Sequence, residues 1–425
     1  MAPGPKLSIS CHCGAAKQIV HLRDKLPNTP QDIDLCHCYA CRHNTGLLCV
    51  SYAGIERPDS IQGLVEYRST TKTITRFFCA TCGCHVFWRR EITLGDSSNA
   101  EIGDDVSQGD WWAVATGVIE GSEEESGEND SEVPIRYAKH INTAGTKDGG
   151  LSPFIQSIEG SREVEVAEAL GASLSSILTP TKTKESSEGE VLNAFCHCKT
   201  VRFHITRPNA ASKLPRSNFA DLIVPYKTGS PQIQNPEDDK WWLRPGLDSA
   251  VKGSKSLPGE ELGPRRYLAG TCACRSCRLI SGFEIQTWAF VPRANIFFHL
   301  DKTTSGASEE ANIVPLDFEA LPPNILRSYE SREGVRREFC SHCGATVFWR
   351  DRWRPELIDV SVGLLDAAEG ARADTWLDWW TGRVSFAEDA GLGKTGETAR
   401  RAICLIDSLE EGLKRWGEER QKSTS

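Results

Sequence analysis

Three short cysteine motifs occur twice in this chain, in the same order, and they constrain its fold more than any other feature. The longest match is between FFCATCGCHVFWR at 77–89 and REFCSHCGATVFWR at 337–350. Both stretches hold Cys-x-x-Cys-Gly followed by Val-Phe-Trp-Arg. A supersecondary unit repeated in this way indicates that one module is present twice.

The other two motifs repeat with the same internal spacing. ISCHCGAAKQIV matches AFCHCKTVRFHI, and LCHCYACRHNTG matches TCACRSCRLISG. A Tyr-x-Ser precedes each third motif, at Tyr67 and Tyr329, and a glycine follows it in similar surroundings, at Gly117 and Gly363. The paired cysteines are Cys11, Cys13, Cys36, Cys38, Cys41, Cys79 and Cys82 in the first repeat, and Cys196, Cys198, Cys272, Cys274, Cys277, Cys340 and Cys343 in the second.

Tight pairing of the cysteines favours metal binding over disulfides. The chain has 17 Cys, an odd number, and its first residues, MAPGPKLSIS, lack the features of a secretion signal. We therefore expect a cytoplasmic protein in which the thiols are reduced. The net charge of -9 argues against a nucleic-acid partner, and the absence of a long apolar run argues against a membrane.

The duplication predicts two domains in 425 residues. We place the first at residues 1–165, a polar linker at 166–190, and the second at 191–392. The second domain contains a long insertion at about 209–266, rich in Pro, Gly and charge. Residues 393–425 form the C-terminal segment.

The predicted secondary structure is mainly β. VRFHI, KTITRFF, ATVFWR and ELIDVSVGLL alternate apolar and polar residues and are rich in β-branched or aromatic side chains. The tail from Gly396 differs, because its apolar residues recur at steps of three and four, which predicts one amphipathic helix. These residues are Ala402, Ile406, Leu409, Leu413 and Trp416.

The cysteine spacing predicts how sulfurs converge. On a strand, residues i and i+2 face the same side, so Cys11 with Cys13, and Cys36 with Cys38, could each direct two sulfurs at one point. In the Cys-x-x-Cys-Gly turns, Gly83 and Gly344 are expected to take a backbone angle that other residues resist.

Seven thiolates per repeat suit one closed zinc site of four ligands and one open site of three. An open site leaves a position for water or a substrate sulfur. Spacing alone does not say which motifs join. The alternatives are that every site is structural, with another side chain as fourth ligand of the second site, or that the cysteines are buried core thiols.

Several residues near the motifs are not expected to bind the metal. Cys49 and Cys84 have no counterparts in the second repeat and are expected to pack in the core. His12, His37 and His197 lie between two cysteines, so a strand would point them away from the metal, toward the surface or a supporting position. Trp88 and Trp349 are expected in the aromatic core rather than in a pocket.

At these motifs the sequence resembles the glutathione-dependent formaldehyde-activating enzyme family, whose domain is shared with centromere protein V. The resemblance rests on Cys-His-Cys-Gly, then Cys-His-Cys-x-x-Cys-Arg with a nearby Gly, then Phe-Cys-x-x-Cys-Gly before an apolar Phe-Trp. It covers both repeats and implies two tandem zinc-bound β-tent domains, made of twisted antiparallel sheets, with surface insertions and the C-terminal helix.

The resemblance also implies a pairing of the motifs. The first and last motifs would form the closed site, and the middle motif the open, catalytic one. It therefore implies two Zn²⁺ per domain and up to four per chain. The closed ligands would be Cys11, Cys13, Cys79 and Cys82, and Cys196, Cys198, Cys340 and Cys343; the catalytic ligands would be Cys36, Cys38 and Cys41, and Cys272, Cys274 and Cys277.

The activity implied is that of a carbon–sulfur lyase acting on an adduct of glutathione and an aldehyde, such as S-hydroxymethylglutathione. Glutathione would be the co-substrate, and a small thiol or aldehyde the partner. The alternative is a non-enzymatic zinc module for protein interaction. The second repeat departs from the pattern at Lys199 and Ala273, in place of Gly14 and His37, and carries the insertion before Cys272. We therefore expect the first repeat to bind glutathione more tightly.

Overall fold

The computed structural model describes residues 4–23, 30–68, 74–91, 110–122, 135–158, 162–167, 190–226, 231–246, 265–300 and 312–423. Within these ranges the protein is mainly β, as predicted, and it has the expected C-terminal helix and two short α-helices that were not predicted. None of the helices in these ranges is long and apolar enough to cross a membrane. The predicted linker at 166–190 falls almost entirely outside the described residues.

The first repeat contains a five-stranded antiparallel sheet and three smaller sheets. The large sheet has the order β4-β8-β7-β6-β5. Its strands are β4 (Tyr52–Ile55), β5 (Leu64–Arg68), β6 (Ile74–Cys79), β7 (His85–Arg90) and β8 (Trp111–Ala115). The smaller sheets comprise β1 (Lys6–Ile9), β2 (Gln18–His21) and β9 (Ile119–Ser122); β3 (Gln31–Cys36), β10 (Ile135–Ile141) and β13 (Glu165–Ala167); and β11 (Ser157–Ile158) with β12 (Arg162–Glu163).

The second repeat has a larger sheet of the same design, with the order β16-β17-β18-β24-β23-β22-β21 and β25 beside β17. Its strands are β16 (Leu243–Arg244), β17 (Arg266–Cys272), β18 (Gln286–Pro292), β21 (Leu326–Arg332), β22 (Val335–Cys340), β23 (Thr346–Asp351), β24 (Leu357–Ser361) and β25 (Leu377–Trp379). A four-stranded sheet comprises β14 (Val191–Phe195), β15 (Arg202–Thr206), β19 (Ile296–Leu300) and β20 (Asn312–Pro315).

The duplication is visible in the strand registers. On β6 and β7, Arg76 lies opposite Trp88, and on β22 and β23, Arg337 lies opposite Trp349. One pair further toward the cysteine turn, each ladder has a bulge, between Phe77 and Phe78 and between Glu338 and Phe339. The two repeats therefore place equivalent side chains at equivalent points of equivalent sheets.

The two repeats pack against each other through backbone as well as side chains. The amide of Gly117 donates to the carbonyl of Gly282 at 2.9 Å, and the amide of Gly363 donates to the carbonyl of Gly46 at 3.1 Å. A Cβ at Gly117 would lie 2.4 Å from the Gly282 carbonyl carbon. Such close approach requires glycine. One continuous hydrophobic core contains residues from both repeats.

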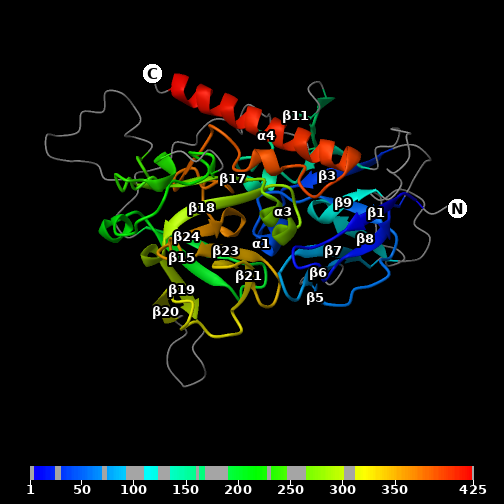
Figure 1. Ribbon diagram of the computed structural model, residues 1–425, viewed down its shortest axis with the longest axis horizontal. Coiled ribbons are helices and arrows are strands. Elements are labelled where there is room, and N and C mark those ends of the chain that lie inside the picture. Colours follow the sequence, from blue (N-terminus) through cyan, green and yellow to red (C-terminus); the bar gives the residue numbers. More distant parts are fainter. Residues whose placement is uncertain are drawn as a thin grey trace.

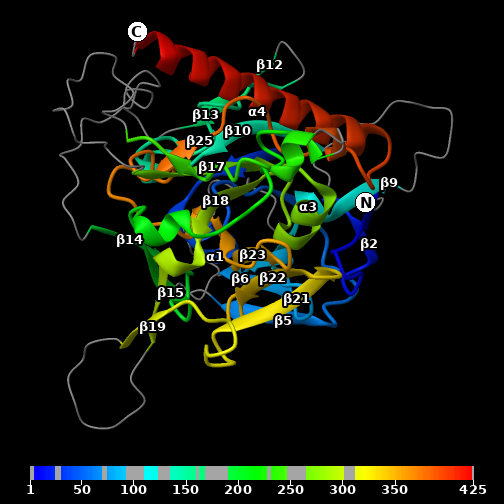
Figure 2. The same ribbon diagram turned by 60° about the vertical axis from the view of Figure 1, so that its left-hand side comes forward.

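The C-terminal helix α4 (Gly396–Ser423) lies along one side of the molecule, across both repeats (Figure 1). Figure 2 shows the same helix from another direction, above β10 and β17. The apolar face predicted from the sequence is its buried face: Ala402, Ile406, Leu409, Leu413 and Trp416 are all buried. The predicted amphipathic helix is confirmed.

Candidate metal centres

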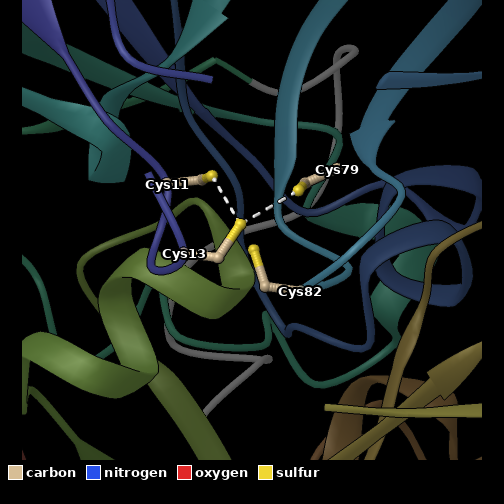
Figure 3. A group of neighbouring side chains, drawn as sticks. All are labelled: Cys11, Cys13, Cys79 and Cys82. Carbon is tan, nitrogen blue, oxygen red and sulfur yellow. Dashed lines mark hydrogen bonds between the residues drawn. The ribbon is translucent and has the colours of Figure 1, made fainter. Parts of the chain in front are cut away.

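Each repeat brings its first and third cysteine motifs together in a four-sulfur cluster. The sulfurs of Cys11, Cys13, Cys79 and Cys82 all lie within 4.8 Å of one another, and the four side chains point toward one another (Figure 3). The equivalent cluster is made by Cys196, Cys198, Cys340 and Cys343. This is the grouping that the family resemblance implied and that spacing alone left open.

A turn, rather than a strand, presents the sulfurs of Cys11 and Cys13, whereas Cys79 and Cys340 are the last residues of β6 and β22. Cys11 and Cys13 follow the end of β1, in a turn that the amide of Gly14 closes by donating to the Cys11 carbonyl at 3.0 Å. The expectation that this pair lies on a strand is wrong, because the chain must curl to aim both sulfurs at one point. Gly14 has φ +82°, and its counterpart Lys199 has φ +61°, so the second repeat keeps the turn despite its non-glycine residue.

The Cys-x-x-Cys-Gly turns of the third motifs have the predicted backbone conformation at their glycines. Gly83 and Gly344 have φ of +76° and +77°, and the amide of each donates to the carbonyl of Cys79 or Cys340. Each glycine also faces an aromatic ring of the other repeat: a Cβ on Gly83 would lie 2.6 Å from Phe339. The closed clusters therefore lie against the boundary between the repeats.

The middle motif of each repeat forms a separate three-sulfur cluster. Cys36 ends β3, Cys38 precedes helix α1 (Tyr39–Thr45), and Cys41 lies in its first turn. The Cys38 sulfur accepts a hydrogen bond from the Cys41 amide at 3.3 Å, so it caps the helix. Cys272, Cys274 and Cys277 take the same positions at the end of β17 and the start of α3 (Arg275–Ser281). Here too the expected strand geometry for Cys36 and Cys38 is replaced, by a strand end followed by a helix.

The sulfur spacing fits zinc. Sulfur separations include 3.6 Å for Cys11 and Cys13, 3.3 Å for Cys196 and Cys198, and 3.8 Å for Cys36 and Cys41. Zinc–sulfur bonds of about 2.3 Å in a tetrahedron place sulfurs about 3.8 Å apart, whereas a disulfide needs about 2.05 Å. All four clusters could therefore hold a zinc ion, and the thiolate donor set is the one that zinc prefers.

A buried arginine contacts each three-sulfur cluster, and the sequence interpretation missed it. Arg76 Nη2 donates to Cys41 Sγ at 3.1 Å, and Arg337 Nη1 donates to Cys277 Sγ at 3.2 Å. Hydrogen bonds from Cys36 and Cys38, together with the charge of Arg76, hold the pKa of Cys41 well below its usual value. The signal was present, because each arginine stands three residues before the first cysteine of its third motif.

The second nitrogen of each arginine finds a different partner. Arg76 Nη1 donates to the Tyr52 hydroxyl at 3.2 Å, while Arg337 Nη2 donates to Ser276 Oγ at 3.1 Å. Burial raises the pKa of Tyr52 to about 12, so its hydroxyl stays protonated. The two three-sulfur sites therefore share a frame but differ in their surroundings.

The histidines between the paired cysteines point away from the sulfurs, as expected, but two of them link the repeats. His12 Nδ1 and the Tyr329 hydroxyl share a hydrogen bond of 3.0 Å, and His197 Nδ1 and the Tyr67 hydroxyl share one of 2.7 Å. His12 Nε2 also lies 3.2 Å from Ser276 Oγ. The closed site of the first repeat is thereby connected to the open site of the second.

The third histidine is a buried residue rather than a surface one. His37 is 0% exposed, and its Nε2 lies 2.9 Å from His140 Nδ1. His140 Nε2 donates to the carbonyl of Ile155 at 2.8 Å. Ala273 takes the His37 position in the second repeat and is also buried.

The two unmatched cysteines lie in the core, whereas the tryptophans of the third motifs are partly exposed. Cys49 and Cys84 are buried, as predicted for core packing. Trp88 and Trp349 are only half-buried, and Trp349 packs against the apolar cluster formed by Cys272, Cys277 and Trp288. The second tryptophan therefore lies at a cysteine site rather than in the main core.

The described part of the long insertion packs on the second repeat through a separate apolar cluster. Its Trp241 and Trp242 are buried with Leu268 and Phe290. The insertion also brings Asp221 near Cys277: burial raises the pKa of this carboxyl, and the thiolate adds to the effect. The equivalent cysteines of the two open clusters have the same burial at two of three positions: Cys38 and Cys274 are half-buried, and Cys41 and Cys277 are buried. The first position differs, because Cys36 is half-buried and Cys272 is buried.

A model of the glutathione-dependent formaldehyde-activating enzyme family matches residues 6–103 and 263–383. The second matched segment starts after Cys196 and Cys198, which the structure nevertheless brings to Cys340 and Cys343. No curated protein and no solved structure matches the chain.

Proposed function

Because the chain belongs to the glutathione-dependent formaldehyde-activating enzyme family, we propose that it is a zinc-dependent carbon–sulfur lyase acting on an adduct of glutathione and an aldehyde. One observation carries the proposal: each repeat has a four-sulfur cluster and, separately, a three-sulfur cluster beside a buried arginine. Four thiolates close a zinc site, whereas three leave a coordination position for a reactant.

Zinc held by Cys36, Cys38 and Cys41 would act as a Lewis acid that favours the thiolate form of a reactant thiol at neutral pH. The protein's own residues would then set the charge of the site. Three thiolates outweigh a divalent cation by one negative charge, and the guanidinium of Arg76 balances it. Its hydrogen bond to Cys41 places that charge next to the sulfurs.

The reaction balances without a redox partner. The sulfur of glutathione forms a bond to the aldehyde carbon, the π electrons of the carbonyl move to its oxygen, and this oxygen gains the proton that the thiol loses. Cleavage of the adduct is the reverse. The residues around Cys41 would contribute chiefly by holding the two reactants in position.

We assign the main reaction to the first repeat. The two open clusters differ in burial at their first cysteine: Cys36 is half-buried, whereas its equivalent Cys272 is buried. This exposure favours the approach of a reactant sulfur to the first site. The closed clusters would serve the fold, because a structural zinc adds its binding free energy to stability.

The test is zinc content combined with glutathione calorimetry. We expect about four zinc ions per chain. We also expect glutathione binding that Cys38→Ser abolishes and Cys274→Ser preserves. The opposite pattern would move the reaction to the second repeat. A zinc content near two with no response to glutathione would instead indicate a non-enzymatic zinc module, because only the closed clusters would then hold metal.

A further inference from the structure

In each repeat, one residue pairs through its backbone with the first cysteine of the three-sulfur cluster, and the residue that follows it differs between the repeats. β10 runs parallel to β3, with Ile141 paired to Cys36, and the amide of His37 donates to the Ile141 carbonyl at 3.0 Å. In the second repeat Ser385 takes the place of Ile141: it bridges to Cys272, and its carbonyl accepts from the Ala273 amide at 2.9 Å. The next residues, Asn142 and Phe386, are therefore structural equivalents.

Both residues have left-handed backbone, with φ of +58° at Asn142 and +53° at Phe386. Asparagine tolerates this conformation, but for a bulky aromatic residue it is a strained outlier. Strain of this kind persists where the surrounding structure or a function requires a particular side chain. The aromatic ring at position 386 is thus kept at a cost in free energy.

The two side chains give their sites opposite character. Asn142 Nδ2 donates a hydrogen bond to Cys36 Sγ at 3.5 Å, so it presents an amide to the first cluster. Phe386 packs against the apolar cluster of Cys272, Cys277 and Trp288. The first site therefore has a polar neighbour where the second has an aromatic one.

A second pair of equivalent residues is likewise more polar in the first repeat and more apolar in the second. Tyr52 pairs with the last residue of β8, and Trp288 with the last residue of β24, so they occupy the same point of the sheet. Tyr52 offers a hydroxyl that already binds Arg76, whereas Trp288 is buried against the cysteines. Trp349, half-buried beside this cluster, has its equivalent in Trp88 of the first repeat, so the two sites differ at Phe386 and Trp288.

The side chains beside the second cluster favour an apolar substituent on the reactant sulfur. Such a substituent would gain contact with Trp288 and Phe386, where the first site has Tyr52 and Asn142.

From this geometry we infer that the second three-cysteine site accepts a thiol, or a thiol adduct, with an apolar or aromatic substituent, and that Phe386 is a specificity-determining residue for it. The inference rests on the proposed function, since it needs a sulfur ligand to reach the open cluster. The chain would then handle two classes of adduct, a polar one in the first repeat and an apolar one in the second.

The test uses the chain loaded with Co²⁺, whose absorption bands report thiolate ligands directly. Benzyl mercaptan and 2-mercaptoethanol are titrated into Cys38→Ser, which leaves the second open site, and into Cys274→Ser, which leaves the first. Metal content and circular dichroism establish that both variants remain loaded and folded. The closed clusters already supply four sulfur ligands, so the absorption of their cobalt ions should not change when a thiol is added.

We expect the preference for benzyl mercaptan over 2-mercaptoethanol to be at least about tenfold greater at the second site. Adding Phe386→Asn to Cys38→Ser should reduce that preference toward the value of the first site, and asparagine suits the left-handed backbone, so folding is preserved. Equal preferences at both sites, unchanged by Phe386→Asn, would overturn the inference while leaving the proposed function intact. Absence of any change in the cobalt bands with either thiol, at either site, would overturn the proposed function itself.

Discussion

His12 of the first repeat and Tyr329 of the second share a hydrogen bond of 3.0 Å, and the arrangement recurs with the repeats exchanged, between His197 and Tyr67. Each of these histidines stands between two cysteines of a closed cluster, and each tyrosine lies on the strand before the other repeat's third motif. The closed clusters are therefore supported by the opposite repeat.

Removing either hydroxyl should weaken this contact between the repeats. We expect Tyr329→Phe to lower the free energy of unfolding by about 1 kcal/mol, because it leaves one half-buried ring nitrogen of His12 without that partner. Tyr67→Phe should have an effect of the same size, and the two should add in the double variant, since the pairs are separate. Urea denaturation measures all three values; a double variant as stable as the wild type would contradict the linking role.

The outer and middle cysteines should respond differently to substitution. Cys79→Ser or Cys340→Ser should unfold the corresponding repeat, because a closed zinc site contributes folding free energy directly. Cys38→Ser or Cys274→Ser should keep the native circular dichroism and lower the zinc content by up to one ion per chain. Metal analysis and circular dichroism on the four variants decide this, and unfolding by the middle variants alone would reverse the assignment of the sites.

The glycine contacts between the repeats should not tolerate a methyl group. A Cβ at Gly117 or Gly363 would lie 2.4 Å from backbone of the opposite repeat, so we expect Gly117→Ala and Gly363→Ala each to cost about 3 kcal/mol. Gly145→Ala is the matched control, because no heavy atom lies within 4 Å of its Cβ position. Equal stability of Gly117→Ala and Gly145→Ala would show that the interface yields easily.

Arg76 should affect ligand binding more than metal content. We expect Arg76→Met to weaken glutathione binding about tenfold, because the site keeps the net negative charge of its thiolates without the balancing guanidinium. Zinc content should be unchanged, and Arg337→Met should leave the first site's affinity as it was. Calorimetry on both variants checks this; the same dissociation constant in Arg76→Met and wild type would reduce Arg76 to a packing role.

Lys394 should make stability depend on pH in a defined direction. It is 8% exposed, its Nζ lies 3.4 Å from Glu284, and it donates to the Ile119 carbonyl at 2.7 Å. Burial, followed by the charge of Arg278, lowers the pKa of Lys394 to about 7. Between this value and the unfolded pKa of about 10.4, the unfolded chain binds more protons, so stability due to this group rises with pH.

Lys394→Met isolates that contribution, since both proteins have the same cysteines. The difference in unfolding free energy, wild type minus variant, should increase from pH 7 to pH 9, by at most about 1.4 kcal/mol per unit. Urea titrations at the two pH values measure it. A difference that stays constant or falls would show that Lys394 remains charged in the folded protein across this range.

Local chemistry in the sequence determined much of this protein. The cysteine motifs indicated four thiol clusters, the alternation of side chains indicated a mainly β fold, and the periodicity from Gly396 indicated α4. The sequence also predicted the left-handed backbone of Gly83 and Gly344, because each glycine closes a Cys-x-x-Cys turn. Each of these features depends on residues within a few positions of one another, so it can be predicted from the sequence.

Tertiary structure decided what lies between distant residues. Cys13 and Cys79 are 66 positions apart, and only the pairing of strands around the core brings their sulfurs to 3.4 Å. The contact of His12 with Tyr329 spans 317 positions. Equivalent positions such as Asn142 and Phe386 could not be matched by sequence, because dissimilar stretches separate them from the motifs and only the parallel strand contacts align them. Spacing in a chain limits what can meet, but packing selects which residues do meet, because burial and hydrogen bonding are satisfied over the whole fold at once.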